Sequence, residues 1–481
     1  MLRIPSPQTF PPETLSLDDL VPQSHLVRKV DAALDFEFIR DLVTPLYCQN
    51  NGRPAIDPVM LIKMMLLGYL FGVPSERRLV QEIQVNMAYR WFLRLGLTDK
   101  VPDASTLSQN RRRRFNHSDV FQPIFDNIVE QAIRKGFVGG RELYTDSTHL
   151  KASANPHKSG NIRHPVPPGA YLDALEKAVN EDRAKSGKKG LTPAHKERQR
   201  KAKVSTTDPE SGFMHRTNKP KGFFYLDHRT VDGKANIILD TYATAGNVHD
   251  SQPLIGRLKR QRTRFPLNPI AVVLDAGYFT APVCHLTLEL GLTPVISYRR
   301  PNKGPNTFQK KQFIYDPQQD CYVCPQGETL IYTTTGRQGY RYYRTAAGIC
   351  QACPLRAACT RAKKGKTLTR HIWEADKEKA RDIRLSPWGK KVHKRRKETI
   401  ERSFADAKQH HGHRYAHFRG LLKVQIQCLL AATAQNIKKI ALLEAALYWF
   451  YLWIIREFTG TETQSRSGKR RVGDKSGKIG R

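Results

Sequence analysis

The order of the short apolar segments between residues 141 and 299 restricts the fold more than any other feature of this chain. Segments rich in aromatic and β-branched residues, each with the composition of a strand, follow one another at 141–146, 222–232 and 235–246. Helix-like and strand-like segments then alternate at 251–265, 270–275, 281–292 and 294–299. Consecutive strands followed by such an alternation predict an α/β fold, in which helices pack on a mixed sheet.

The chain is strongly basic, with 80 Lys and Arg against 44 Asp and Glu, a net charge of +36. A surplus of this size attracts polyanions and indicates a nucleic-acid partner, although a ribosome-associated or merely soluble basic protein has the same property. Four adjacent arginines, Arg111 to Arg114, are expected to contact phosphate, and a solvated helix end is the alternative. Charge alone does not separate these classes.

Composition divides the chain into units around the expected sheet. Residues 54–135 show apolar spacings of three and four, which predict helices, and with the basic charge of the chain we expect residues 1–135 to be an N-terminal helical DNA-binding domain. The core is expected in two parts, 136–300 and 376–460, the first interrupted by a basic insertion at 160–221. A Cys-rich insertion, 301–375, separates them, and 461–481 is expected to be a basic disordered tail.

The N-terminal residues lack the pattern of a secretory signal peptide, so we expect a cytoplasmic, nucleoid-associated protein. One membrane-like run, 445–455, is far shorter than the roughly 20 residues that a spanning helix needs. We expect this run to be buried core or a subunit contact, with no membrane partner.

Three carboxylates have the setting of a catalytic site. Asp146 and Asp275 end apolar strands, where neighbouring strands would bring them together, although an aspartate there often only caps the next turn. Glu401 lies between Ile400 and Phe404 at helical spacing, so we expect it to face inward. Three carboxylates coexist at one point only when cations neutralise them, and two Mg²⁺ (or Mn²⁺) ions would catalyse phosphodiester displacement there.

Five cysteines are close together in the sequence: Cys321, Cys324, Cys350, Cys353 and Cys359. Their paired Cys-x2-Cys spacing is typical of a structural Zn²⁺ site held by four of the five, and unligated thiols are the alternative. Cys48, Cys284 and Cys428 lie in apolar surroundings and are expected in the core.

Several further polar residues invite a metal interpretation. Asp250, next to His249, is expected to cap the helix that follows rather than to bind metal. The histidines near the end of the chain are expected to meet DNA backbone or solvent rather than a metal: His410, His411, His413 and His417.

The segments TDSTHLKASAN, STTDPESGF, GNVHDS, LDAGYF, CPLRAAC and KETIERSFADAKQHHGHRYAHFRG occur in this order, and with Asp146, Asp275 and Glu401 among them the chain resembles the insertion-sequence DDE transposases. The resemblance implies an RNase H-like core whose Asp, Asp and Glu bind the catalytic metals. It also implies action on the terminal inverted repeats of a mobile element and on target DNA, by a homodimer.

Many members of that family carry Tyr, Arg, Glu and Lys at fixed spacing. Glu401 and Lys408 keep the Glu-x6-Lys spacing, but the Tyr and Arg positions fall on Lys394 and Lys397, and the rival Glu398 has no lysine at the matching distance. A lysine contacts phosphate as a point charge. DNA contacts are therefore expected from Lys394, Lys397, Arg402, Lys408 and Arg414, in addition to the four arginines.

The sequence thus predicts a transposase that hydrolyses the element ends and joins the freed 3′ hydroxyl to target DNA. An RNase H-like nuclease or resolvase would use the same carboxylates without joining strands. A catalytically inactive, zinc-containing DNA-binding regulator is the non-enzyme alternative.

Overall fold

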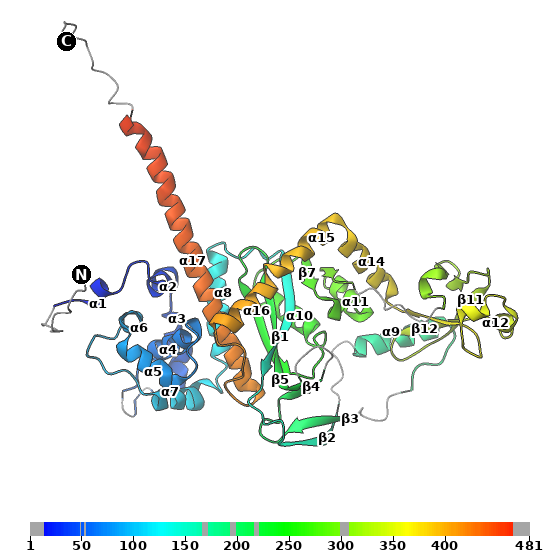
Figure 1. Cartoon of the computed structure of the whole chain (residues 1–481), viewed down its shortest axis with the longest axis horizontal. Coiled ribbons are helices and arrows are strands. Elements are labelled where there is room, and N and C mark those ends of the chain that lie inside the picture. The colour runs from blue at the N-terminus through cyan, green and yellow to red at the C-terminus, as the bar shows by residue number, and fades with distance from the viewer. Residues whose placement is uncertain are drawn as a thin grey trace, which may run out of the picture.

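The computed structural model describes residues 14–48, 50–51, 54–165, 172–192, 199–215, 221–298 and 307–464. Its N-terminal region is helical (Figure 1) and consists of α1 (Leu17–Leu20), α2 (Leu26–Ala33), α3 (Phe38–Val43), η1 (Thr44–Leu46), α4 (Pro58–Leu70), α5 (Glu76–Val85), α6 (Met87–Phe92), α7 (Ala104–Asn110), η2 (Arg111–Phe115) and α8 (Phe121–Arg134). Helix α4 begins where Asp57 accepts from the Val59 N–H and Pro58 occupies the first turn. Most of its side chains are buried, so it is the centre of this region.

The central sheet contains β1 (Glu142–Lys151), β4 (Gly212–Met214), β5 (Gly222–Asp232), β6 (Ile238–Ala245), β7 (Ala271–Leu274) and β8 (Thr293–Ile296). Its main order is β6-β5-β1-β7-β8, and β4 pairs with the start of β5. The pairs β6–β5 and β5–β1 are antiparallel, whereas β1–β7 and β7–β8 are parallel. This mixed sheet confirms the predicted α/β fold class.

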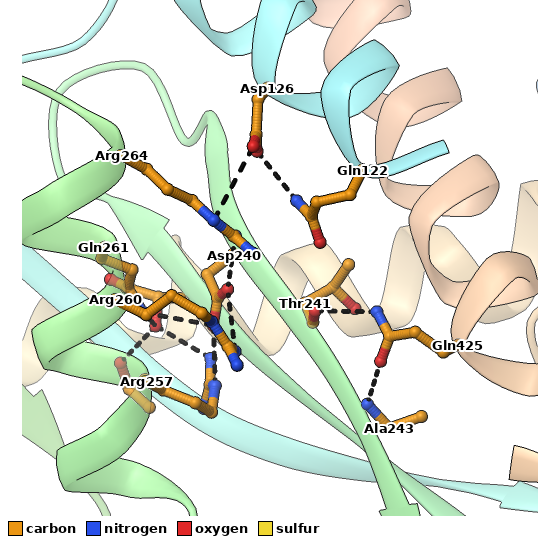
Figure 2. Close-up of polar contacts among 12 residues, drawn as sticks. Gln122, Asp126, Asp240, Thr241, Ala243, Arg257, Arg260, Gln261, Arg264 and Gln425 are labelled. Atoms are coloured by element: carbon orange, nitrogen blue, oxygen red, sulfur yellow. Dashed lines mark hydrogen bonds and ion pairs between the residues drawn. The ribbon is translucent and has the colours of Figure 1, made fainter. Parts of the chain in front are cut away.

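Helices α10 (Leu254–Arg264) and α11 (Ala281–Glu289), with η3 (Ala276–Tyr278), connect the parallel strands. A buried acid attaches α10 to the sheet: Asp240 of β6 pairs with Arg257 at 2.7 Å and with Arg264 at 3.3 Å (Figure 2). Arg264 also approaches Asp126 of α8 at 3.7 Å. A buried carboxylate is tolerated only when it is neutralised, so this cluster fixes α10 against β6 and α8 together.

The remaining core helices are α14 (Glu374–Leu385), α15 (Pro387–Lys394), η5 (Arg395–Lys397), α16 (Ile400–His410) and α17 (Leu421–Gln464). The first half of α17 packs against β6, α2, α4 and α8. Its Gln425 accepts from the Ala243 N–H at 2.6 Å and donates to the Thr241 carbonyl at 3.1 Å, which covers the edge strand β6 (Figure 2). One continuous apolar core therefore joins the helical region to the sheet.

The second half of α17 projects away from the rest of the chain (Figure 1). Burial ends at Ala441, and the run 445–455 is largely exposed. The expectation that this run is buried within the chain is therefore wrong, because the helix continues past its supporting surface; a subunit contact stays a prediction. Among the described residues, no helix is both long and apolar enough to cross a membrane.

The Cys-rich insertion forms a second sheet with the order β13-β12-β11-β10-β9. Its elements are η4 (Lys310–Gln312), β9 (Ile314–Asp316), β10 (Cys321–Val323), β11 (Thr329–Thr335), β12 (Tyr340–Arg344), α12 (Ile349–Ala352), α13 (Arg356–Cys359) and β13 (Thr367–His371). A small aromatic cluster around Tyr322 and Tyr343 is its core. The strands of this unit were not anticipated, because their apolar pattern is too weak to predict them.

The basic stretch around 160–221 contains two antiparallel strands, β2 (Ser159–Pro165) and β3 (Gln199–Ser205), with the helix α9 (Leu172–Lys185) between them in the sequence. Buried Asp182 of α9 accepts from Thr335 at 2.5 Å and forms an ion pair with Arg341. Helix α9 therefore packs on the Cys-rich sheet rather than extending freely into solvent, because this acid matches a basic position on that sheet.

Candidate active site

The pairing of β1 with β7 brings two of the predicted carboxylates together. Tyr144 is the register partner of Val273, so Asp146 and Asp275, each two residues further on, lie side by side. Asp146 does not end its strand as expected, because β5 pairs with β1 as far as Lys151. Asp275 directly follows β7 and accepts from the Gly277 N–H at 2.8 Å, so it also caps η3.

The electrostatics of Asp146 reflect this neighbourhood. Burial raises the pKa of Asp146 to about 6, Arg396 opposes the shift, and the Asp275 carboxylate adds to it. The Tyr278 hydroxyl is buried and makes no hydrogen bond among the described residues. Burial raises the pKa of Tyr278 well above its usual range, and Asp146, Asp250 and Asp275 raise it further. The group of acids therefore favours a bound cation.

Glu401 lies in the first turn of α16, but its orientation differs from the expected one. Ile400 and Phe404 are buried, as is Ser403, whereas the Glu401 side chain is 53% exposed. The buried face of α16 passes through positions 400, 403, 404 and 407, so Glu401 stands at the rim of that face rather than within it. This position leaves the carboxylate accessible from solvent.

Arg396 of η5 joins the first carboxylate to the third. Its Nη2 atom lies 2.5 Å from Asp146 Oδ2, and its Nε atom lies 4.0 Å from Glu401 Oε1. The side chain is only 5% exposed, and Nη1 donates to the carbonyl of Thr145 at 3.3 Å. Sequence reasoning missed Arg396: it singled out Lys394 and Lys397, and only the run of cations before Glu401 signalled that one of them could turn inward.

Asp250 contributes a fourth acid at this edge of the sheet. Its Oδ1 atom accepts from Ser147 Oγ at 2.8 Å, beside Asp146. Helix α10 begins only at Leu254, with Pro253 at its N-cap, so the prediction that Asp250 caps this helix is wrong. The preceding His249 contacts Ser251 at 2.8 Å.

Within the described residues, one group of three metal-type ligands has all its atoms within 4.8 Å of one another: Asp227, His413 and Cys428. The Asp227 carboxylate accepts from Arg229 at 2.6 Å, Thr241 at 2.5 Å and His413 at 2.8 Å. Because the guanidinium already neutralises this acid, the group is a buried polar contact rather than a metal site. The predicted carboxylates and cysteines are more widely spaced than this group.

The histidines differ from their predicted role. His411 and His413 are fully buried, and His411 Nδ1 lies 2.8 Å from the Tyr69 carbonyl oxygen. The His417 ring stacks on Tyr69, with 6.3 Å between ring centroids, whereas His410 is exposed. Expecting DNA or solvent at His411 and His413 was therefore wrong: these side chains hold the chain after α16 against the helical region and the sheet.

The predicted DNA contacts fall into two groups. Arg111 pairs with Glu76 at 2.8 Å and lies 4.2 Å from the centroid of the Phe418 ring, so it joins two regions of the protein and is not free to contact phosphate. The other predicted cations are accessible, with Lys408 partly covered: Arg112, Arg113, Arg114, Lys394, Lys397, Arg402, Lys408 and Arg414.

In the Cys-rich insertion, four thiols are electrostatic neighbours. Burial raises the pKa of Cys359, Lys366 lowers it, and Cys350, Cys324 and Cys353 raise it further. The Cys324 sulfur accepts from the Gln326 N–H at 3.4 Å. Four thiols form a ligand set that suits Zn²⁺.

Gly365 lies beside one thiol of this group. Gly365 has φ of +88°, and a Cβ there would lie 3.0 Å from the Cys350 sulfur, so only glycine allows the chain to pass so close.

The other cysteines are separate from this group. Cys321 is buried within β10, and its sulfur lies 3.9 Å from Gln319 Oε1. Burial raises the pKa of Cys321, and its charged neighbours are Asp316 and Asp320 rather than the other thiols. Cys284 and Cys428 are buried, as predicted, whereas Cys48 is exposed, so its assignment to the core was wrong.

Comparison with known proteins adds to this geometry. A family model described as a transposase domain (DUF772) matches residues 15–113, and one described as a transposase DDE domain matches residues 323–441, including Glu401. Among solved structures, the chain matches a piggyBac transposase in a cryo-EM synaptic complex with hairpin DNA, with 11% identity and a TM-score of 0.31, over 86% of this chain and 78% of that chain. No curated protein gives a significant sequence match.

Proposed function

Because this chain belongs to the insertion-sequence DDE transposases, we propose that Asp146, Asp275 and Glu401 hold the metal ions with which it cuts and joins DNA at the ends of a mobile element. The observation that carries this assignment is the β1–β7 register, which sets Asp146 beside Asp275, together with the Arg396 guanidinium that reaches from Asp146 toward Glu401. Carboxylates at a partly buried edge fit a hard divalent cation.

Two Mg²⁺ or Mn²⁺ ions bound there would activate the attacking oxygen and stabilise the leaving oxygen. Two side chains of this chain would have to move for the ions to bind. Arg396 must withdraw from Asp146 before that carboxylate binds metal, since the guanidinium already occupies Oδ2. Glu401, being largely exposed on α16, would complete the ligand set by a side-chain rotation or a small helix movement.

The DNA contacts would come from the exposed cations. Lys394, Lys397 and Arg402 lie next to η5 and Glu401 in the sequence, while Arg112, Arg113 and Arg114 are presented by the helical region. These residues would bind the phosphates of the terminal inverted repeats and of target DNA, without specifying sequence themselves. A mobile element has two ends, so we expect a homodimer in the DNA complex, located at the nucleoid.

The Cys-rich insertion would bind one structural Zn²⁺ ion through Cys324, Cys350, Cys353 and Cys359. The support is that Cys350, Cys324 and Cys353 lie near enough to Cys359 to raise its pKa, whereas Cys321 is not among the neighbours that do so. A tetrahedral site requires the thiols to converge further, and metal binding would supply the free energy for that closure.

The decisive test is to incubate the purified protein with a labelled element end, with and without Mg²⁺, and to map the cut. We expect cleavage at the terminus and joining of the 3′ end to a second duplex, both lost in Asp146→Ala. Cleavage without joining would support the nuclease alternative. Binding without any cleavage, unchanged in Asp146→Ala, would support the regulator.

A further inference from the structure

The second half of α17 carries an exposed apolar surface that has no part in the proposed catalysis or DNA contacts. Between Glu444 and Arg456 the sequence contains no charged residue. Seven consecutive apolar or aromatic side chains within it are 37–67% exposed: Leu447, Tyr448, Trp449, Phe450, Tyr451, Leu452 and Trp453. We call this set the α17 patch.

The patch surrounds the helix instead of following one side. Seven consecutive residues make about two turns, so apolar side chains point in every direction. A helix that is apolar all round is normally enclosed by other structure, and exposed apolar surfaces of this size mark interaction sites. The base of the projection is held where Glu444 pairs with Lys135 of the helical region at 2.8 Å, so the patch is presented on a supported helix (Figure 1).

The chemistry of the patch excludes two kinds of partner. DNA is recognised through cations, and the patch has none. A helix lying in a membrane interface has a polar face opposite its apolar one, and the patch has no such face. What remains is an apolar protein surface.

We propose that two copies of this chain associate through the α17 patch, with each helix covering the other around a twofold axis. In such a contact the same surface serves both partners, so a self-complementary apolar patch is sufficient. This inference deepens the homodimer of the proposed function and rests on it.

The size of the patch fits the proposal. The five aromatic residues alone bury roughly 150–250 Å² each when enclosed, and they are now a little more than half exposed, so covering them removes roughly 450–750 Å² per copy. With the two leucines this approaches the roughly 800 Å² per partner of a stable interface. Trp and Tyr are also the residues that dominate binding energy in such contacts.

Charge gives the dimer a distinctive salt dependence. Each copy carries +36, so two copies repel each other at low ionic strength. The patch itself has no charge to be screened. Added salt should therefore strengthen the dimer, since the Debye length falls from about 10 Å at 0.1 M to about 3 Å at 1 M.

The test measures the mass of the full-length protein without DNA by analytical ultracentrifugation at several salt concentrations, for wild type and for Trp449→Glu/Trp453→Glu. These two side chains are one turn apart on the same face and exposed, so the double substitution should preserve the circular dichroism spectrum. We expect a dimer in wild type, tighter at high salt, and a dissociation constant at least about 100-fold higher in the double variant. Val85→Glu, a matched change at an exposed apolar position of α5, should leave the dimer intact.

Fluorescence provides a second measurement. Two of the five tryptophans lie in the patch, so dilution of wild type should shift emission to longer wavelength as the dimer separates. A wild type that is monomeric at all concentrations, a dimer that survives the double substitution, or a monomer that sediments with lipid vesicles would overturn the proposal.

Failure of the proposed function is separable, because cleavage of a single labelled end tests the carboxylates alone. The double variant should still cut such an end and should lose joining of paired ends. If wild type forms the dimer but cuts no DNA, the interface stands and the catalytic assignment falls.

Discussion

The two candidate metal sites of this chain differ in what holds them together before a metal arrives. In the sheet, strand pairing sets Asp146 beside Asp275, and Arg396 supplies a positive charge from within the protein. In the Cys-rich insertion, Cys324, Cys350, Cys353 and Cys359 lie on short turns and helices between strands, and the three other thiols raise the pKa of Cys359 while Lys366 lowers it. The fold therefore sets two carboxylates of the first site side by side before metal binds, whereas the four thiols of the second would converge only around their ion. Metal should control activity in one and local stability in the other.

The largest effect should come from the sheet site. Asp146→Asn removes a metal ligand, so we expect cleavage of an element end to fall by about 10³-fold or more, because the carboxylates act as a unit. The protein should still fold, since removing the buried charge relieves its desolvation cost and the repulsion from Asp275, which together outweigh the lost attraction of Arg396. The measurement is single-turnover cleavage together with the melting temperature.

The comparison of Glu401→Gln with Glu398→Gln provides the matched control for this prediction. Both change a glutamate just before or within the start of α16, but only Glu401 approaches Arg396. Equal loss in the two variants would show that Glu401 has no special role.

In the Cys-rich insertion, loss of a metal ligand should reduce local stability. Cys359→Ser should reduce zinc affinity at least about 100-fold, because losing a direct ligand exceeds the 10–100-fold cost of losing a supporting residue. It should also lower the melting temperature of the insertion while leaving the sheet folded. Zinc content by mass spectrometry and hydrogen exchange resolved by region would measure both. Cys321→Ser, whose thiol is apart from the four, should keep one zinc per chain; loss of zinc there would show that the ligand set is wrong.

A substitution of Arg396 should strengthen metal binding at the sheet site instead of abolishing it. Because its guanidinium competes with metal for Asp146, Arg396→Gln should tighten Mn²⁺ binding by roughly tenfold, equivalent to about 1.4 kcal/mol. Paramagnetic resonance of free Mn²⁺ would measure this without requiring activity. Arg395→Gln removes a neighbouring arginine that pairs with Glu142 instead, and should leave Mn²⁺ affinity unchanged. Weaker binding in Arg396→Gln would mean that the arginine helps to shape the site.

A smaller effect should be common to both regions. Burial lowers the pKa of His393, beside the core site, and of His371, in the insertion, to about 4 each. Between pH 6.5 and 4 these histidines are protonated in the unfolded chain but neutral in the folded one, so acid favours unfolding. Their contribution to the free energy of unfolding is therefore fully present above pH 6.5 and is lost as pH falls toward 4. His393→Gln should flatten the pH dependence of melting in the core, and His371→Gln in the insertion, each variant serving as the control for the other. A steep acid transition that persists unchanged in both variants would assign it to other groups.

The fold was predictable because its signal is local. The strand at 270–275 and the helix at 281–292 are periodic enough to read directly, and parallel pairing then brings Asp146 to Asp275. Positions that depend on distant contacts were not predictable. The Arg396 side chain is buried because carbonyl and carboxylate oxygens accept its hydrogen bonds. The Arg111 side chain pairs with Glu76 and packs on the Phe418 ring. Neighbouring arginines look identical in the sequence.

The histidines illustrate the same point. His411 and His413 stand among cations in the sequence, which indicated an exposed setting, but a carbonyl from α4 and a carboxylate from β5 receive them. The same reasoning explains Glu401, whose helix was identified correctly while its rotation by part of a turn was not. Helical spacing fixes which residues share a face, but the neighbouring surface decides how far that face extends.

The shared core between α17, the sheet and the N-terminal helices has a geometric consequence. Since α17 packs on both of these regions within the part of the chain that the structure describes, a duplex bound by the exposed arginines of η2 would meet the acids in β1 and beside β7 at an offset set by that packing. The protein would thus fix the distance along the DNA between the bound sequence and the cleaved bond. Inserting half a helical turn of DNA between the sequence it grips and the bond it cuts should then move the target bond out of register, instead of being absorbed by a flexible linker.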